Sequence, residues 1–171
     1  MKERASLATL LCLALGLGSA ARAETPALKP AAKGAAMATR ASGTFEVQVK
    51  PLPGDEKVEG LSVGRLSLAK QFKGDLEGTS KGEMTTTGTT VQGSAGYVAI
   101  ERVSGSLGGR SGSFVLLHQG TMKSGGDFKL SIVVVPDSGT EGVTGLAGSM
   151  AIIIADGKHS YEFDHTLPDT P

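Results

Sequence analysis

From residue 43 onward the chain consists of short apolar runs separated by glycine-containing turns. This pattern limits the folds that it can adopt. From residue 43 onward, no long stretch repeats its apolar residues with the 3.6-residue period of a helix. Instead, β-branched and apolar residues come in runs bounded by Gly, Asp, Ser and Pro, which is typical of strands. Four dipeptides, at 73–74, 108–109, 125–126 and 156–157, allow the positive φ angles of tight hairpins. The sequence therefore predicts an all-β domain.

Eight strands are predicted, at residues 43–50, 61–71, 75–86, 95–105, 110–122, 127–135, 146–155 and 160–167. Sequential hairpins of similar length favour an up-and-down antiparallel sheet, and eight such strands can close into a barrel. Closure removes the unpaired edges through which sheets aggregate. We expect this barrel at residues 43–168, and a sandwich is the alternative architecture.

The first 23 residues have the pattern of a secretory signal peptide, with a charged start, an apolar run over residues 5–17 and small residues that end at Ala23. The apolar run is shorter than the ~20 residues that a spanning helix needs. Residues 24–42 are rich in Ala, Pro and Lys, so we expect a flexible linker there. The sequence predicts an exported protein, periplasmic or extracellular, without membrane contact after the leader is cleaved.

Cysteine content and charge exclude several classes of function. The one cysteine, Cys12, lies in the predicted leader, so the mature chain has no disulfide, cysteine nucleophile or thiolate metal site. The chain has 17 basic and 17 acidic residues, of which the leader takes three and one, which leaves 14 and 16 and a net charge of −2. This balance does not suit a nucleic-acid-binding protein, and we expect no nucleic-acid partner.

Two full charges stand side by side in the fourth predicted strand, at Glu101 and Arg102. Neighbours in a strand point to opposite faces, so one of the two must face the interior of a closed barrel. With residues 108–109 as a two-residue turn, cross-strand pairing places one set of side chains on a common face. This set contains Tyr97, Ala99, Glu101, Val103, Phe114, Leu116 and His118.

We predict that Glu101 is the inward charge, because its face carries the aromatic residues and puts His118 diagonally across from it, about 5–8 Å away at the Cβ atoms. In an apolar interior, both groups would have shifted pKa values and could exchange protons with a ligand. The candidate ligand-binding residues are Tyr97, Glu101, Phe114 and His118, and Glu101 and His118 are also the candidate catalytic residues. The structural alternative is that Glu101 and His118 satisfy one another or face a neighbouring subunit.

The histidines are not predicted to form a metal site. His159 and His165 share a face of the last predicted strand, but six residues separate them, about 20 Å along a strand. The sequence contains no His-x-His pair. We therefore expect no metal and no other cofactor.

Three predicted strands carry large apolar residues on both faces, at 115–117, 132–135 and 152–154. If only the barrel interior were buried, these runs would leave an apolar stripe in water. No helix is predicted that would cover the stripe. We therefore expect a second copy of the chain to cover it, in a homo-oligomer.

Three segments of the chain resemble a bacterial domain-of-unknown-function family, number 3224. They are AGYVAIERVSGSLGGRSGSFVLLHQGTM (95–122), VVPDSGTEGVTGLAGSM (134–150) and DGKHSYEFDHTLP (156–168). The resemblance extends over about residues 37–168. It implies an eight-stranded antiparallel barrel similar to those of plant allene oxide cyclases and dirigent proteins, which tend to assemble as small oligomers. It implies no activity, and no functional residue is carried over from those proteins.

Three functions stay open on the sequence alone. The first is a non-catalytic barrel that binds a small, mainly apolar ligand in its lumen. The second is a cyclase or isomerase in which Glu101 or His118 accepts a proton while the apolar wall holds the conformation of a small hydrophobic substrate. The third is a structural oligomer whose core is filled by side chains.

Overall fold

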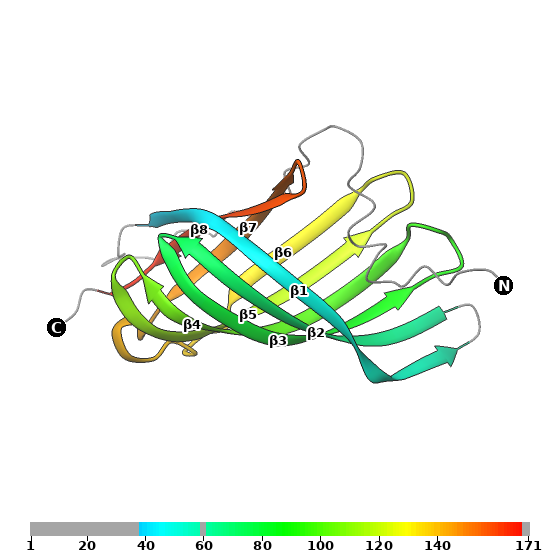
Figure 1. The fold of residues 1–171 in the computed structure, drawn as a ribbon, viewed down its shortest axis with the longest axis horizontal. Coiled ribbons are helices and arrows are strands. Elements are labelled where there is room, and N and C mark those ends of the chain that lie inside the picture. Colours follow the sequence, from blue (N-terminus) through cyan, green and yellow to red (C-terminus); the bar gives the residue numbers. More distant parts are fainter. Residues whose placement is uncertain (1–37, 59–60, 169–171) are drawn as a thin grey trace.

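The computed structural model describes residues 38–58 and 61–168, which form one closed β-barrel (Figure 1). Eight antiparallel strands follow one another around the ring in chain order, and β8 pairs with β1 to close it. The strands are β1 (Thr39–Val58), β2 (Leu61–Gly74), β3 (Leu76–Gly88), β4 (Ala95–Leu107), β5 (Arg110–Met122), β6 (Phe128–Val134), β7 (Ala147–Ala155) and β8 (Lys158–Thr166). A short 3-10 helix, η1 (Glu141–Val143), lies between β6 and β7. The predicted eight-stranded antiparallel barrel is confirmed, and the sandwich is excluded.

The start of the domain differs from the prediction. β1 begins at Thr39, inside the segment 24–42 that was expected to be a linker. Residues 39–42 belong to the barrel because their backbone pairs with β8, from Thr39 opposite His165 to Ser42 opposite Glu162. Large apolar side chains are not needed for this backbone pairing, so composition did not reveal it. The predicted leader, residues 1–23, and the linker up to residue 37 lie outside the described residues.

Within residues 38–58 and 61–168, the model contains no helix long and apolar enough to cross a membrane.

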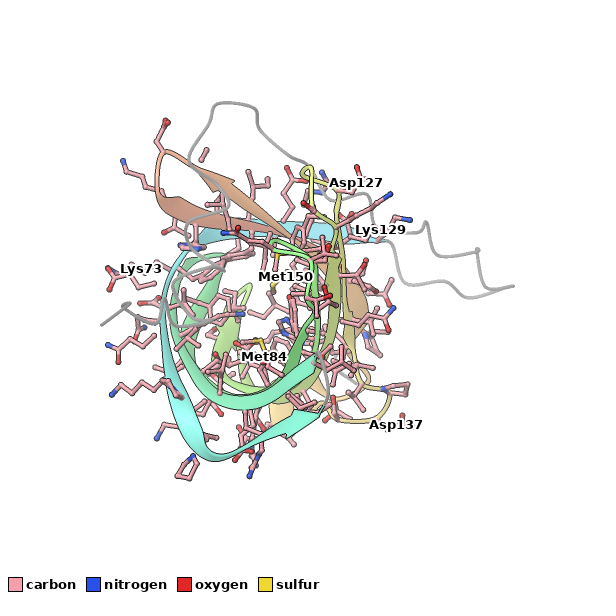
Figure 2. All side chains as sticks on the ribbon, turned by 90° about the vertical axis from the view of Figure 1, so that its right-hand side faces the viewer. Lys73, Met84, Asp127, Lys129, Asp137 and Met150 are labelled. Atoms are coloured by element: carbon pink, nitrogen blue, oxygen red, sulfur yellow. The ribbon has the colours of Figure 1, made fainter. Side chains whose placement is uncertain are left out.

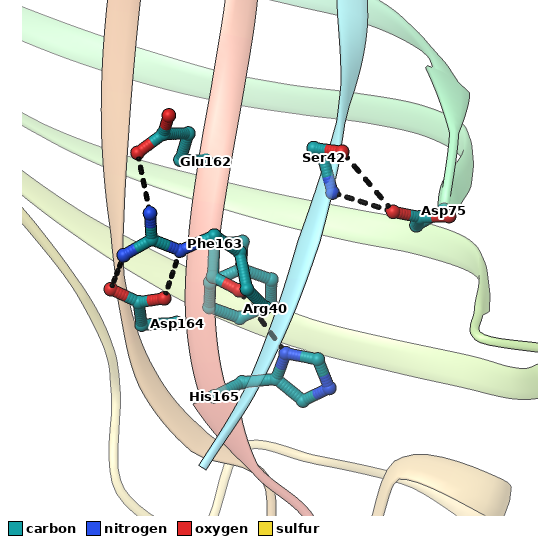
Figure 3. Close-up of polar contacts among 7 residues, drawn as sticks. All are labelled: Arg40, Ser42, Asp75, Glu162, Phe163, Asp164 and His165. Carbon is teal, nitrogen blue, oxygen red and sulfur yellow. Dashed lines mark hydrogen bonds and ion pairs between the residues drawn. The ribbon is translucent and has the colours of Figure 1, made fainter.

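The seam between β1 and β8 carries an ionic contact at its outer side (Figure 3). The guanidinium of Arg40 donates to both carboxylate oxygens of Asp164, at 2.6 and 2.7 Å, and to Glu162 at 3.0 Å. The hydrogen bond and the charge of Asp164, followed by the charge of Glu162, raise the pKa of Arg40. Ser42 N–H, further along β1, donates to the carboxylate of Asp75 at 2.8 Å. The Arg40 contacts join β1 to β8, and the Ser42 contact joins β1 to the turn between β2 and β3. Both are exposed to solvent, so they add little stability.

The β4–β5 hairpin has the two-residue turn that the sequence predicts. Gly108 and Gly109 have φ angles of 56° and 83°, which residues with a Cβ rarely adopt. From this turn the register runs without a shift to Ala99 opposite His118. The shared inner face predicted for this hairpin is therefore confirmed.

One half of the barrel interior is a dense apolar core, called the packed half below. All eight strands and the β6–β7 connection contribute to it. Its buried members are Ala41, Phe45, Phe72, Leu76, Val103, Leu107, Phe114, Leu116, Leu130, Ile132, Val134, Val143, Leu146, Met150, Tyr161 and Phe163. The rings of Phe114 and Phe163 stack with centroids 5.9 Å apart, and the Tyr161 hydroxyl accepts a hydrogen bond from Leu76 N–H at 2.8 Å. This half therefore has the interdigitated packing of a protein core.

The other half of the interior, called the smaller half, holds far fewer apolar groups. Its buried members are Leu66, Leu68, Met84 and Ala99, and Val49 and Tyr97 lie partly buried beside them. In Figure 2, Met84 of the smaller half and Met150 of the packed half both point into the ring, whereas the labelled charged side chains point away from it. The interior thus consists of two unequal apolar regions.

The outer face of β4 and β5 carries exposed apolar side chains. Val98 and Ile100 of β4 are 54% and 53% exposed, and Leu117 of β5 is 40% exposed. Ile100 stands directly opposite Leu117, so these side chains lie together. The apolar stripe was predicted on residues 115–117, 132–135 and 152–154, of which only Leu117 is exposed, while the others are buried or partly buried. The other exposed members of the patch lie on β4, where the sequence analysis did not place one. The homo-oligomer inferred from this patch stays a prediction.

Candidate functional site

The two adjacent charges of β4 lie on opposite sides of the barrel wall. Glu101 faces the interior and its side chain is fully buried, with an exposure of 0%. Arg102 is exposed, and its guanidinium donates to the Ser113 hydroxyl at 3.1 Å. The predicted inward orientation of Glu101 is confirmed.

Glu101 belongs to a band of polar side chains that crosses four neighbouring strands inside the barrel. We call this band the polar belt, and its members are Lys70 (β2), Ser80 (β3), Glu101 (β4) and His118 (β5). Lys70 stands directly opposite Ser80, and on the inner face of β2 it lies between Leu68 of the smaller half and Phe72 of the packed half. The belt therefore separates the two apolar halves of the interior.

The belt is centred on the carboxylate of Glu101. Lys70 Nζ donates to Oε2 at 2.8 Å, and the Ser80 hydroxyl donates to Oε1. His118 Nε2 is buried and lies 2.8 Å from Oε2, and apart from this close contact it has no hydrogen-bond partner among the described residues. Both carboxylate oxygens are thus engaged, while Nε2 has no further partner within this part of the chain.

Lys70 is held from a second direction by aromatic rings. Its ammonium lies 5.0 Å from the centroid of Phe45 and 5.7 Å from that of Phe72. Such contacts with ring faces attract a cation and add to the ion pair with Glu101. The ammonium is therefore fixed between the carboxylate and the packed half.

The surroundings of the belt shift the pKa values of its titratable groups. Burial alone would raise the pKa of Glu101, but the close contact with His118 and the charge of Lys70 outweigh burial and bring this pKa to about 2. Burial, helped by the charge of Lys70, lowers the pKa of His118 despite the nearby Glu101. Near pH 7 the belt therefore contains an ionised carboxylate and a neutral imidazole.

Tyr97 is partly buried next to the belt and packs against both apolar halves. It stands opposite Gly120, and a Cβ atom at Gly120 would overlap the ring of Tyr97. The absence of a side chain at Gly120 therefore leaves room for this ring. Burial, followed by the charge of Glu101, raises the pKa of Tyr97 to about 12. The phenol therefore keeps its proton and is available as a donor.

The structure brings some of the predicted site residues together and separates one from them. Glu101 and His118 are in contact, and Tyr97 lies on the same inner face. Phe114 shares that face but lies in the packed half, where its ring stacks on Phe163. Whether any of these residues binds a ligand stays a prediction.

Lys70 and Ser80 are belt residues that the sequence analysis missed. The signal for Lys70 was present, because Leu66, Leu68, Lys70 and Phe72 alternate with period two and so share one face of a strand. A lysine in the middle of such an apolar set needs a buried partner. Ser80 carries no comparable signal, since serine is ordinary on either face of a strand.

The other two histidines have separate surroundings. His159 is half-buried with its ring 5.1 Å from that of Phe45, and burial, followed by the charge of Lys70, lowers its pKa. His165 is buried, stacks on Phe163, and has Nδ1 3.2 Å from the Phe163 carbonyl oxygen (Figure 3). The part of the chain that the structure describes contains no group of three or more His, Cys, Asp or Glu side chains that could hold a metal ion.

Comparisons with known proteins identify related sequences without an assigned activity. The model of the DUF3224 family, described as a protein of unknown function, matches residues 41–165. The crystal structure of a protein of unknown function from the DUF3224 family of Shewanella oneidensis MR-1 is similar, with 47% sequence identity and a TM-score of 0.73. That similarity covers 78% of this chain and 100% of the other. No curated protein matches the chain.

Proposed function

This chain belongs to the DUF3224 family, as its sequence segments predict, and we propose that its barrel binds a small, mainly apolar molecule in the smaller half. The observation that carries the proposal is His118 Nε2, which is buried and, apart from its close contact with Glu101, has no hydrogen-bond partner among the described residues. Buried polar groups are normally satisfied, and leaving one unsatisfied costs about 1–3 kcal/mol. A ligand with a polar group at its inner end would supply the partner.

The apolar wall beside the belt supports the same proposal. Leu66, Leu68, Met84 and Ala99 are the buried residues of the smaller half, and Val49 and Tyr97 flank them. Small-molecule sites are mostly lined by apolar side chains, with a few polar groups that fix the orientation of the ligand. The smaller half and the belt together have this composition.

A cyclase or isomerase is the second candidate, and the state of the belt decides which residue would accept the proton. Glu101, with a pKa of about 2, is a weak base near pH 7. His118 is neutral there, because burial lowers its pKa, so it is the better proton acceptor. In this candidate function, Glu101 positions the imidazole and does not itself take the proton.

We propose that the exposed patch of Val98, Ile100 and Leu117 joins copies of the chain into a homo-oligomer. The supporting observation is that three large apolar side chains lie together in water on the outer face of β4 and β5. Light scattering should give a multiple of the chain mass for the wild type and the monomer mass for Ile100→Lys. A monomeric wild type contradicts this proposal.

We propose that the protein is exported and that its leader is removed after Ala23. The support is the charged, apolar and small-residue pattern of residues 1–23. The mass of the protein isolated from the periplasm or medium of its host should correspond to a chain that begins at Glu24. Recovery of the uncleaved chain from the cytoplasm contradicts export.

Native mass spectrometry of protein purified from its host tests the ligand proposal without a guess at the ligand. We expect an additional mass that dissociates when the protein is denatured. Ala99→Phe adds a ring to the smaller half and should remove that mass, whereas Ile100→Phe adds the same ring on the outer face of β4 and should retain it. Absence of any bound mass in the wild type would favour a filled structural barrel.

A further inference from the structure

We infer that two copies of the chain join edge to edge through β7, whose open side pairs antiparallel with the same side of β7 in a second copy. The inference rests on the homo-oligomer proposed above and adds the contact that joins the copies. It depends on three features, which are the incomplete pairing of β6 with β7, the residues along the edge of β7 and the apolar surface beside that edge.

The pairing around the ring is weakest between β6 and β7. β7 pairs with β8 over nine residues, from Ala147 to Ala155, and β6 pairs with β5 over seven. Within residues 38–58 and 61–168, β6 and β7 pair at a single position, where Val133 stands opposite Ser149. In Figure 2 the β7–β8 hairpin leans outward from the ring. Beyond Ser149, β7 therefore has a paired strand on one side, and its other side is open to a further strand.

The barrel has a second open edge, on β1, and the sequence protects that edge. Among the described residues, β1 pairs with β8 only over residues 39–45, so the rest of β1 has β2 as its one paired strand. That part of β1 carries Lys50, Pro51 and Pro53, and its register with β2 shifts after Leu52. Charges, prolines and bulges are devices that keep edge strands from pairing with other chains.

The open edge of β7 carries none of these devices. Residues 147–155 read AGSMAIIIA, with no charged residue and no proline. Uncharged segments rich in β-branched residues pair readily with copies of themselves. A contact about a two-fold axis sets each segment against the same segment, so any charge would meet its like. The lack of charge therefore favours a second copy of β7 as the strand that occupies this edge.

Apolar side chains lead from the exposed patch on β4 and β5 to this edge. On the outer face, Ile100 stands opposite Leu117, and Leu117 stands opposite Val133. Val133 is the residue of β6 that pairs with β7. A copy that pairs with the open side of β7 lies beside β6, and so it also approaches the patch. Backbone pairing and burial of the patch thus belong to one contact.

Hydrogen exchange of the wild type at two concentrations tests the inference without any substitution. In dilute, dissociated protein, the amides of residues 147–155 should exchange faster than those of residues 95–107, because β4 is paired along both sides. In concentrated, associated protein, we expect exchange over 147–155 to slow about tenfold or more, because a partner strand then bonds the open edge. Exchange over 95–107 should hardly change, even though this segment carries part of the patch.

The substitution Ile153→Lys tests the edge itself. Ile152 packs against the packed half, so its neighbour Ile153 points to the outer face of β7. Two lysines would meet when the edges pair, and we expect light scattering to give the monomer mass. Ser160→Lys is the matched control, because Ser160 stands opposite Ile153 on β8, one strand further from the edge. This control should keep the mass of the wild type.

The outcomes separate this inference from the homo-oligomer on which it rests. A monomeric wild type overturns both. An oligomeric wild type in which residues 147–155 exchange at the same rate at both concentrations leaves the homo-oligomer standing and overturns pairing through β7. An Ile153→Lys variant that keeps the oligomer mass has the same meaning.

Discussion

The packed half and the smaller half are built from the same strands with the same alternation, yet they are filled very differently. The packed half buries sixteen residues, five of them Phe or Tyr, and draws on every strand. The smaller half buries four residues from β2, β3 and β4, and its one aromatic neighbour, the partly buried Tyr97, also packs against the packed half. The difference suggests that the packed half supplies more of the stability of the fold than the smaller half does.

The polar belt marks the boundary between the halves. On β4 the inner face passes from Ala99 through Glu101 to Val103, from one half to the other within five residues. A buried ion pair is a poor source of net stability, because desolvation offsets the attraction between the charges. The pair therefore marks where one apolar half ends and the other begins without adding much net stability of its own.

Substitution of the two inward methionines allows a direct comparison of how tightly the two halves are packed. Met150 is 1% exposed in the packed half and Met84 is 4% exposed in the smaller half, so Met→Ala removes the same atoms at both places. We expect Met150→Ala to lower the free energy of unfolding by about 4 kcal/mol and Met84→Ala by about 2 kcal/mol, because the cavity term is larger where neighbours cannot collapse. Urea denaturation measures both. Equal losses would mean that the two halves are packed alike.

Breaking the ion pair between Lys70 and Glu101 should lower the free energy of unfolding almost as much as Met150→Ala does. Lys70→Met leaves the buried carboxylate of Glu101 without its ammonium, and we expect a loss of about 3 kcal/mol in the free energy of unfolding. The double variant with Glu101→Gln should recover most of that loss, since no uncompensated charge is left. Chemical denaturation of the two variants gives the comparison, and a double variant as unstable as the single one contradicts a charge-based explanation.

The belt should also make stability depend on pH. The pKa of Glu101 is about 2 in the folded protein and ordinarily 4.5, so its contribution is fully present above pH ~4.5 and is lost as pH falls toward 2. The size of this contribution is about 3 kcal/mol. The lowered pKa of His118 acts in the same direction, because below pH ~6.5 the unfolded chain takes up the proton first. Urea midpoints between pH 7 and 3 should fall for the wild type and change less for Glu101→Gln in the acidic window.

The smallest effect is expected at the outer seam. Arg40 pairs with Asp164 and Glu162 in water, beside the packed half but outside it. Arg40→Gln should leave the urea midpoint close to that of the wild type at physiological salt, since exposed ion pairs contribute little. A large drop would show that the seam, and not the apolar core, limits the stability of this half.

The fold was predictable because its determinants are local. Period-two alternation gave the strands, and the Gly108-Gly109 turn fixed the register that places His118 diagonally from Glu101. The start of β1 was not predictable from composition, because residues 39–42 are held by backbone pairing with β8, far away in the sequence. Local pattern thus specifies each hairpin but not where the ring closes.

The belt was only partly predictable for a similar reason. Glu101 and His118 belong to one hairpin, so a single turn relates them. Lys70 reaches Glu101 from two strands away, and its position depends on the registers of both the β2–β3 and β3–β4 pairs. The apolar residues around Lys70 could have shown that it is buried, but not which carboxylate it meets.

The pairing of Thr39 with His165 brings the first and last strand residues to one mouth of the barrel, the one beside the packed half. An affinity tag, reporter domain or surface linker joined directly before Thr39 or after Thr166 would therefore attach beside the packed half. Tethered in this way, the protein would present its opposite mouth to the surrounding solution, which suits it to immobilised screening of small molecules.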